Sequence, residues 1–89
     1  MAKGKDPRFE AVRTLIEAGK IRDLRGIYDI IPMTTVGTAV GIHKSTLYKK
    51  LINPGLLKIE ECELLAKAFG VTPQTIMTLA LSQMHKKSS

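Results

Sequence analysis

A group of cationic and hydroxyl-bearing side chains recurs at helical spacing near the middle of the chain. Residues three and four apart are neighbours on a helix surface. One side of the helix expected over residues 44–52 therefore carries Lys44, Ser45, Tyr48 and Lys49. Lysine is a charged hydrogen-bond donor, and serine and tyrosine hydroxyls both donate and accept. Such a face is suited to binding a negatively charged partner rather than to making or breaking covalent bonds.

Groups suited to catalysis or metal binding are scarce. The chain has two histidines and one cysteine, with no cofactor loop and nothing resembling a nucleophile–base pair or a metal site. Glu60, Glu61 and Glu63 lie in the first turns of an expected helix, where the helix dipole favours negative charge, and are interpreted as a solvated face. Cys62 falls on an apolar stripe and is interpreted as a buried structural thiol. We therefore expect no enzyme activity, no cofactor, no metal and no small-molecule substrate.

The basic residues are concentrated where acidic residues are absent. Lys and Arg number 14 against eight Asp and Glu, which gives a formal net charge of +6. No acidic side chain lies between Asp29 and Glu60, and the same stretch contains Lys44, Lys49, Lys50 and Lys58. A local excess of positive charge is what a polyanion-binding face requires.

Two short helices joined by a tight turn are expected over residues 33–52. Their inward side is formed by Val36, Val40, Ile42, Leu47 and Leu51. Gly41 falls at the break, where a sharply ending helix needs a residue that tolerates positive φ. Gly37 lies one turn earlier, and its lack of a side chain lets the second helix pack closely against the first. Thr34 or Thr35 is expected to cap the first helix.

Further helices are predicted on both sides of this pair. Asp6 and Pro7 begin a helix that runs to about Ala18. A second apolar stripe runs from Ile21 to Ile31, with Arg22, Asp23, Arg25 and Asp29 facing water, and Pro32 ends it. After the turn at Asn53-Pro54-Gly55, Leu56 and Leu57 are expected to return to the core. A helix over residues 59–69 with Ile59 facing inward, and a last helix capped by Thr72, complete the chain.

These patterns predict an all-α fold, a compact bundle of about six short helices. We expect a disordered N-terminus over residues 1–6, a single domain over residues 7–84 and a disordered tail over residues 85–89. The chain has no apolar run long enough to span a membrane and no secretory signal, so a cytoplasmic protein without a membrane partner is expected.

The run V-G-T-A-V-G-I-H-K-S-T-L resembles the helix-turn-helix of the lambda repressor/Cro-like DNA-binding proteins. Gly37, Gly41 and Ile42 match the family's small residue, glycine and following apolar residue, and Leu47 matches the buried aliphatic of its recognition helix. The stretch L-L-K-I-E-E-C-E-L-L-A-K-A-F-G-V-T-P-Q-T-I resembles the family's next helix, corner and last helix. The resemblance implies a repressor-like helix-turn-helix core to which the first helix is an N-terminal addition.

The resemblance also implies double-stranded DNA as the partner, with residues 44–52 as the recognition helix. The positions that correspond to the family's base-contacting face are His43, Lys44, Ser45, Tyr48 and Lys49. Four further positions are expected to contact phosphates, namely Thr34, Thr35, Lys50 and Lys58. Met33-Thr34-Thr35 replaces the glutamine usual in the family, and the recognition helix lacks arginine, glutamine and asparagine, so modest base discrimination is expected.

The expected function is that of a small transcriptional regulator of phage or mobile-element type that acts as a homodimer, because one short helix buries too little surface for tight binding. The first or the last helix would supply the dimer face. One alternative is a protein-interaction module that keeps the fold without binding DNA. Two narrower alternatives are that His43 is only a helix cap, and that Tyr48 packs its ring on Leu51 or Ile52 and exposes only its hydroxyl.

Overall fold

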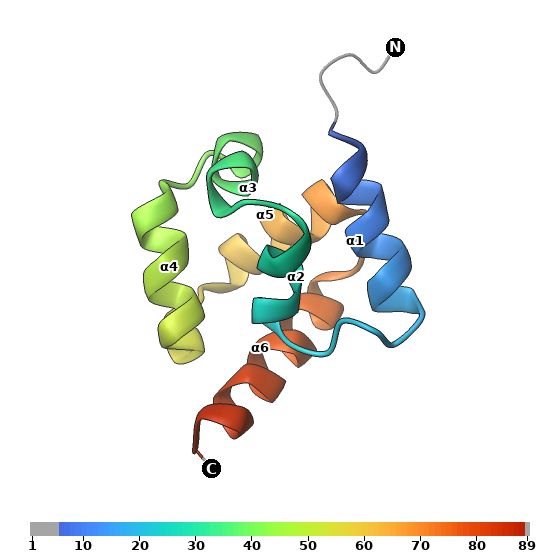
Figure 1. Cartoon of the computed structure of the whole chain (residues 1–89). Helices are drawn as coiled ribbons and strands as arrows, with labels where there is room; N and C mark the ends of the chain where they lie inside the picture. Colours follow the sequence, from blue (N-terminus) through green and yellow to red (C-terminus); the bar gives the residue numbers. More distant parts are fainter. Residues whose placement is uncertain (1–5, 89) are drawn as a thin grey trace.

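Residues 6–88 are described by a computed structural model, in which they form six α-helices and one short 3-10 helix without a strand (Figure 1). The elements in chain order are α1 (Pro7–Glu17), α2 (Leu24–Ile30), α3 (Met33–Val40), α4 (Lys44–Ile52), the 3-10 helix η1 (Pro54–Leu56), α5 (Ile59–Phe69) and α6 (Pro73–Ser88). The all-α prediction is confirmed. In Figure 1, α1 and α4 lie on opposite sides of the bundle, with α2 and α5 between them.

Residues close in sequence determine where α1 begins and where α1 and α5 end. The carboxylate of Asp6 accepts the backbone N–H of Arg8 at 2.9 Å, and Pro7 is the first helical residue, as predicted. Hydrogen bonds from the Arg8 side chain and backbone lower the pKa of Asp6 to about 2. Gly19 and Gly70, which follow the two helices, have φ of 75° and 73°, a region that glycine enters without the steric cost of a Cβ.

The core is aliphatic apart from two phenylalanines and one cysteine. The buried apolar residues are Phe9, Val12, Ile21, Leu24, Ile27, Ile31, Val36, Leu47, Leu51, Cys62, Leu65, Ala66, Phe69, Ile76, Leu79 and Ala80. The rings of Phe9 of α1 and Phe69 of α5 pack together with centroids 5.2 Å apart and planes tilted by 40°. Helix α1 therefore covers part of the core, since it contributes Phe9 and the fully buried Val12.

The second helix starts later than its apolar stripe suggested. Ile21 is buried but lies before α2, which begins at Leu24. Asp23, predicted to face water, is only 8% exposed, and its carboxylate accepts the backbone N–H of Gly26 at 3.0 Å. The prediction for Asp23 was wrong because an N-cap carboxylate is stabilised by the amides that it caps, even where water is largely excluded.

The turn after α4 orients its apolar residues differently from the prediction. Leu56 is 52% exposed and Ile59 is 69% exposed, although both were expected in the core. Pro54 is buried instead, and Leu57 is half-buried against the core as expected. The backbone N–H of Leu57 donates to the Pro54 carbonyl at 3.0 Å. This tight turn places Pro54 and Leu57 inward and the residues between them outward.

The last helix is longer than predicted. α6 runs to Ser88 and includes His85, where a disordered tail was expected, because no glycine or proline interrupts it after Pro73. Asp6, assigned to the disordered N-terminus, is the ordered cap of α1. Residues 1–5 and 89, the rest of the two segments predicted to be disordered, lie outside the described residues.

Within residues 6–88, no single helix is long and apolar enough to cross a membrane. Only α5 and α6 taken together, with a bend of 112° between them, have the length and apolar composition of a membrane span. Leu65, Phe69 and Ile76 of this pair are buried in the helical core. Their apolar character is therefore accounted for by packing within the bundle.

Candidate nucleic-acid interface

The helices α3 and α4 have the predicted bounds and are joined by the predicted glycine turn. Gly41 has φ of 75°, and its N–H donates to the Gly37 carbonyl at 2.8 Å. The N–H of Ile42 donates to the same carbonyl at 3.0 Å. These two hydrogen bonds close the end of α3 and direct the chain into α4 within three residues, Gly41, Ile42 and His43.

Gly37 has no room for a side chain. It is buried, and a Cβ at this position would lie 2.5 Å from the carbonyl oxygen of Ile42 and 3.5 Å from Leu47 Cδ1. The closest contact is therefore with the backbone of the turn, and Leu47 of α4 packs just beyond it. A glycine is therefore required here, but by the carbonyl of the turn, whereas the expectation named the approach of the second helix, whose atoms lie at ordinary contact distance.

The start of α3 differs from the prediction. Pro32 occupies the N-cap position, and Thr34 and Thr35 lie in the first turn, so neither threonine caps the helix. The fixed φ of proline, here −62°, is compatible with the extended N-cap conformation, so α3 begins directly after it. No side chain caps this first turn. Thr34 remains exposed, Thr35 is half-buried, and the hydroxyl of Thr38 donates to the Thr34 carbonyl at 3.0 Å.

An open hollow of about 610 Å³ lies between α3 and the start of α4. Its lining combines predicted residues from both helices, and consists of Thr34, Gly37, Thr38, Gly41, Ile42, His43 and Lys44. Thr38 was not among the predicted site residues, although its position four residues after Thr34 places the two on one helix face. The structure thus brings Thr34, His43 and Lys44 to one concave surface.

His43 is the N-cap of α4, as one of the two interpretations of this residue held. Its Nδ1 accepts the backbone N–H of Ser45 at 3.2 Å and lies 2.9 Å from the Ser45 hydroxyl oxygen. Both residues are exposed. The cap therefore leaves the opposite edge of the imidazole open to solvent.

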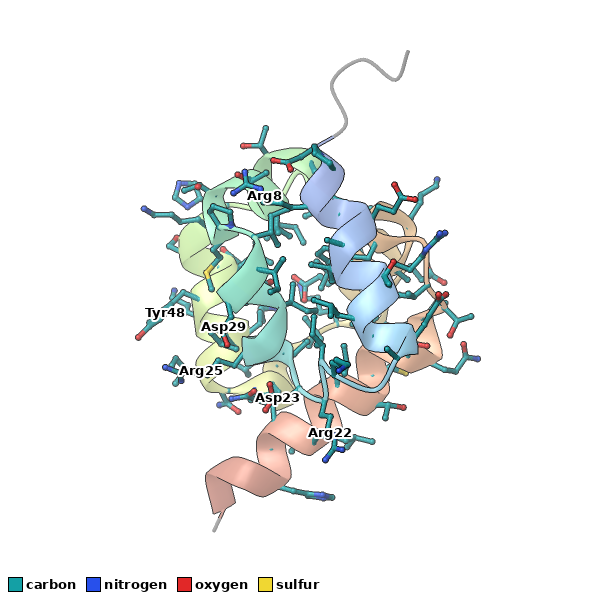
Figure 2. All side chains as sticks on the ribbon, turned by 45° about the vertical axis from the view of Figure 1, so that its right-hand side comes forward. Arg8, Arg22, Asp23, Arg25, Asp29 and Tyr48 are labelled. Atoms are coloured by element: carbon teal, nitrogen blue, oxygen red, sulfur yellow. The ribbon has the colours of Figure 1, made fainter. Side chains whose placement is uncertain are left out.

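The outer face of α4 is polar and accessible. Lys44, Ser45, Tyr48 and Lys49 are exposed, whereas Leu47 and Leu51 are buried. Tyr48 is 56% exposed and projects from the edge of the bundle in Figure 2. The interpretation in which its ring packs against the helix and shows only the hydroxyl is therefore wrong.

Lys50 has a different environment from its neighbours. Its ammonium donates to Glu61 Oε1 at 2.8 Å and to the Leu56 carbonyl at 3.0 Å, and its side chain is only 12% exposed. These contacts argue against the predicted phosphate role, which would require the ammonium to leave them. Lys58 remains exposed at the N-cap of α5.

The electrostatics of this face follow from its composition. Neither α3 nor α4 contains an acidic residue, and Lys44 and Lys49 are exposed on α4. The one acidic side chain paired with α4 in the described ion pairs is that of Glu61, which neutralises Lys50 and lies mostly out of solvent. Lys44 and Lys49 take part in neither of the ion pairs found among the described residues, so the exposed face keeps their positive charge.

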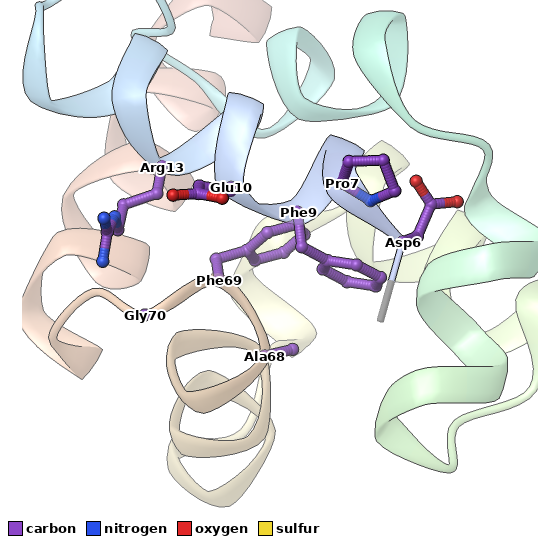
Figure 3. Close-up of a pocket in the computed structure, with 8 residues that line it drawn as sticks. All are labelled: Asp6, Pro7, Phe9, Glu10, Arg13, Ala68, Phe69 and Gly70. Carbon is purple, nitrogen blue, oxygen red and sulfur yellow. The ribbon is translucent and has the colours of Figure 1, made fainter. Parts of the chain in front are cut away.

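A second cavity, of about 360 Å³, lies between α1 and α5 (Figure 3). Its lining includes Phe9, Phe69, Arg13 and Gly70. Both rings belong to the core, and the cavity contains none of the predicted site residues. The hollow beside α3 and α4 is accordingly the candidate interface.

Among the residues that the structure describes, no group of three or more His, Cys, Asp or Glu side chains is placed to hold a metal ion.

The resemblance to the repressor family rests on the residues of the motif alone. No protein-family model matches the chain, and no curated protein or solved structure matches it either.

Proposed function

We propose that this chain binds double-stranded DNA through α3 and α4, with α4 as the recognition helix in the major groove. The observation that carries the proposal is the exposed, acid-free face of α4, which adjoins a concave surface at the glycine turn. An α-helix fits the major groove of B-form DNA, and residues near its N-terminus reach the base edges. On this chain those residues are His43, Lys44 and Ser45.

Each exposed side chain has a role that follows from its chemistry. Lys44 donates to guanine O6 and N7, and Tyr48 and Lys49, one turn further on, contact a base or a phosphate. Thr34, Thr38 and the uncapped first-turn amides of α3 face a backbone phosphate across the hollow. Lys58 adds a flexible positive charge for a second phosphate.

The proposed role is that of a small transcriptional regulator of phage or mobile-element type in the cytoplasm, with steep salt dependence and modest sequence discrimination. The recognition helix offers lysines, serine, tyrosine and histidine rather than the arginine, glutamine or asparagine that make bidentate base contacts. Phosphate contacts therefore supply most of the affinity.

We further propose a homodimer formed through the end of α6 rather than through α1. The described outer surface of α1 is largely polar, with exposed Arg8, Glu10 and Glu17. In contrast, Leu81 is 54% and Met84 is 40% exposed on α6. A Cβ at Gly55 would lie 3.9 Å from the Met84 side chain, so this end of α6 adjoins η1 and the exposed Leu56. Pairing of these apolar side chains removes them from water.

The direct test is fluorescence anisotropy of a labelled random-sequence duplex titrated with the protein at several salt concentrations. Binding is expected with log Kd rising against log salt by about 3 to 6, since each phosphate contact contributes about 0.9. The double variant Lys44→Glu/Lys49→Glu should abolish binding with the helical circular dichroism unchanged. The double variant Lys20→Glu/Lys67→Glu makes the same charge change at exposed positions outside α3 and α4, and should retain most binding.

The alternative is a protein-interaction module, and the exposed apolar side chains Ile52, Leu56 and Ile59 favour it. Absence of DNA binding even at low salt would reject the proposed function and leave this alternative. If both double variants weaken binding equally, then net charge rather than the α4 face is responsible, which also contradicts the proposal.

A further inference from the structure

The cap at the start of α4 determines which ring nitrogen of His43 carries the proton. The backbone N–H of Ser45 is a donor only, and it lies 3.2 Å from His43 Nδ1. Nδ1 must therefore accept, and it carries no proton. In a neutral imidazole the remaining proton then resides on Nε2, so the edge of the ring opposite the cap is a hydrogen-bond donor.

The same constraint orients the hydroxyl of Ser45. Its oxygen lies 2.9 Å from the same Nδ1. Because Nδ1 has no proton to give, the hydroxyl is the donor in this contact and shares the single lone pair of Nδ1 with the Ser45 N–H. The lone pairs of the hydroxyl oxygen are left for an external partner. An unconstrained serine hydroxyl either donates or accepts, whereas this one, while it donates to Nδ1, offers an external partner only its lone pairs. Lys44 and Lys49 on the same face are donors only, so Ser45 supplies an acceptor that they lack.

We propose that Ser45 reads the exocyclic amino group of a base, adenine N6 or cytosine N4, and that His43 is the positioning residue that imposes this preference. His43 Nε2–H donates to an acceptor, either a base N7 or carbonyl oxygen or a phosphate. In the major groove, amino groups are the only donors that bases present, so an acceptor-only side chain distinguishes adenine and cytosine from guanine and thymine on the strand it contacts. This inference rests on the proposed binding of DNA.

The first test needs no DNA. Long-range nitrogen–proton correlation spectra of the labelled protein in mildly alkaline buffer distinguish the two imidazole tautomers. The expected result for His43 is an unprotonated Nδ1 and a protonated Nε2, and the Ser45→Ala variant should keep the same tautomer because the backbone N–H remains. A protonated Nδ1 in the wild-type protein overturns the proposal.

The second test uses the preferred duplex obtained by selection from a random library. The positions read by Ser45 are those at which Ser45→Ala relaxes the preference. Replacing adenine there by purine, or cytosine by 2-pyrimidinone, removes only the amino group, and should weaken wild-type binding about three- to tenfold, the effect of one net hydrogen bond. Binding by Ser45→Ala should be unaffected by the same replacement.

Variants of His43 separate positioning from capping. His43→Asn keeps a side-chain oxygen that caps α4 and accepts the Ser45 hydroxyl, so the sensitivity to the amino group should persist. His43→Ala frees the hydroxyl and should reduce that sensitivity with circular dichroism confirming the fold. A guanine or thymine preference at the Ser45 position, or equal sensitivity in all three proteins, overturns the proposal. If the spectra show the expected tautomer but the protein does not bind DNA, the proposed function has failed, and the base-reading role of Ser45 fails with it. The assignment of the hydrogen bonds at the cap then still holds.

Discussion

Lys50 and Glu61 form an ion pair that joins the end of α4 to the start of α5. The Lys50 ammonium lies 2.8 Å from Glu61 Oε1 and 3.1 Å from Oε2, and also donates to the Leu56 carbonyl. Glu61 Oε1 in turn accepts the backbone N–H of Lys58 at 2.8 Å. The two side chains are only 12% and 13% exposed. One pair of charges thus connects α4, η1 and α5.

Replacing Glu61 by glutamine should lower the free energy of unfolding by about 1–3 kcal/mol. The variant leaves the Lys50 ammonium in a poorly solvated position without its counter-charge. Urea denaturation followed by circular dichroism measures the difference. Glu60→Gln, at the adjacent exposed position, is the matched control and should change stability by less than about 0.5 kcal/mol. Equal effects of the two substitutions would contradict a structural role for the pair.

The same carboxylate should contribute to acid sensitivity. Burial raises the pKa of Glu61, but hydrogen bonds from Lys50 and from the Lys58 backbone, together with the nearby charges, outweigh it and hold the pKa below the ordinary value of 4.5. The unfolded state therefore binds the proton first as pH falls. The stability supplied by Glu61 is complete above about pH 4.5 and is lost as pH falls through the lower pKa of the folded state.

The measurement that checks this is the free energy of unfolding against pH for the wild-type protein and Glu61→Gln. Asp6, with its own lowered pKa, is present in both proteins, so the difference between the two curves isolates Glu61. That difference should shrink as the solution is acidified below pH 4.5. A difference that stays constant with pH would show that the glutamate contributes through packing rather than through charge.

Much of the fold could be predicted because its signals are local. Asp6 with Pro7 begins α1, Gly41 ends α3, and Thr72 caps α6 by accepting the backbone N–H of Thr75 at 3.2 Å. Each of these residues acts on atoms within a few positions in the chain, so its effect depends little on the rest of the molecule. The bounds of α3, α4 and α5 were accordingly close to those expected.

The errors lie where the outcome depends on contacts distant in sequence or on competing local choices. The pairing of Lys50 with Glu61 spans 11 residues and requires the η1 turn to bring the two together. Leu56 and Leu57 are adjacent apolar residues, and only the direction of that turn decides which one is buried. At the start of α3, the extended backbone of Pro32 takes the N-cap position that was expected for Thr34 or Thr35. The exposure of Lys44, Ser45, Tyr48 and Lys49 was easier to predict, since helical spacing alone separates them from Leu47 and Leu51.

Alanine at position 37 should destabilise the protein by about 1–3 kcal/mol, because its Cβ would lie 2.5 Å from the Ile42 carbonyl oxygen and the backbone of the turn must move. Gly55→Ala is the control, since its Cβ would make only ordinary contacts at 3.6 and 3.9 Å. Thermal unfolding of both variants gives the comparison. If Gly37→Ala is as stable as the wild-type protein, the Ile42 carbonyl does not lie as close to α3 as described.

Cys62 should resist alkylation in the folded protein. The residue is 3% exposed, and burial together with the negative charge of Glu61 raises the pKa of its thiol. The thiolate is the reactive species, so both accessibility and ionisation oppose reaction. Mass spectrometry should show iodoacetamide addition many times more slowly than in urea-unfolded protein. Rapid addition under native conditions would indicate that α5 opens locally without global unfolding.

Lys49 and Lys50 are neighbours in sequence but should differ in their contribution to DNA binding. The Lys49 side chain is exposed on the outer face of α4, whereas the Lys50 ammonium contacts Glu61 and the Leu56 carbonyl. Lys49→Gln should therefore reduce the slope of log Kd against log salt by about 0.9, the value expected for one lost phosphate contact. Lys50→Gln should leave the slope nearly unchanged while lowering the unfolding midpoint in urea, so the binding comparison is made at a temperature where both variants are folded. An equal reduction in slope for the two variants would mean that Lys50 leaves Glu61 for a phosphate when DNA binds, and that the ion pair belongs to the free protein alone.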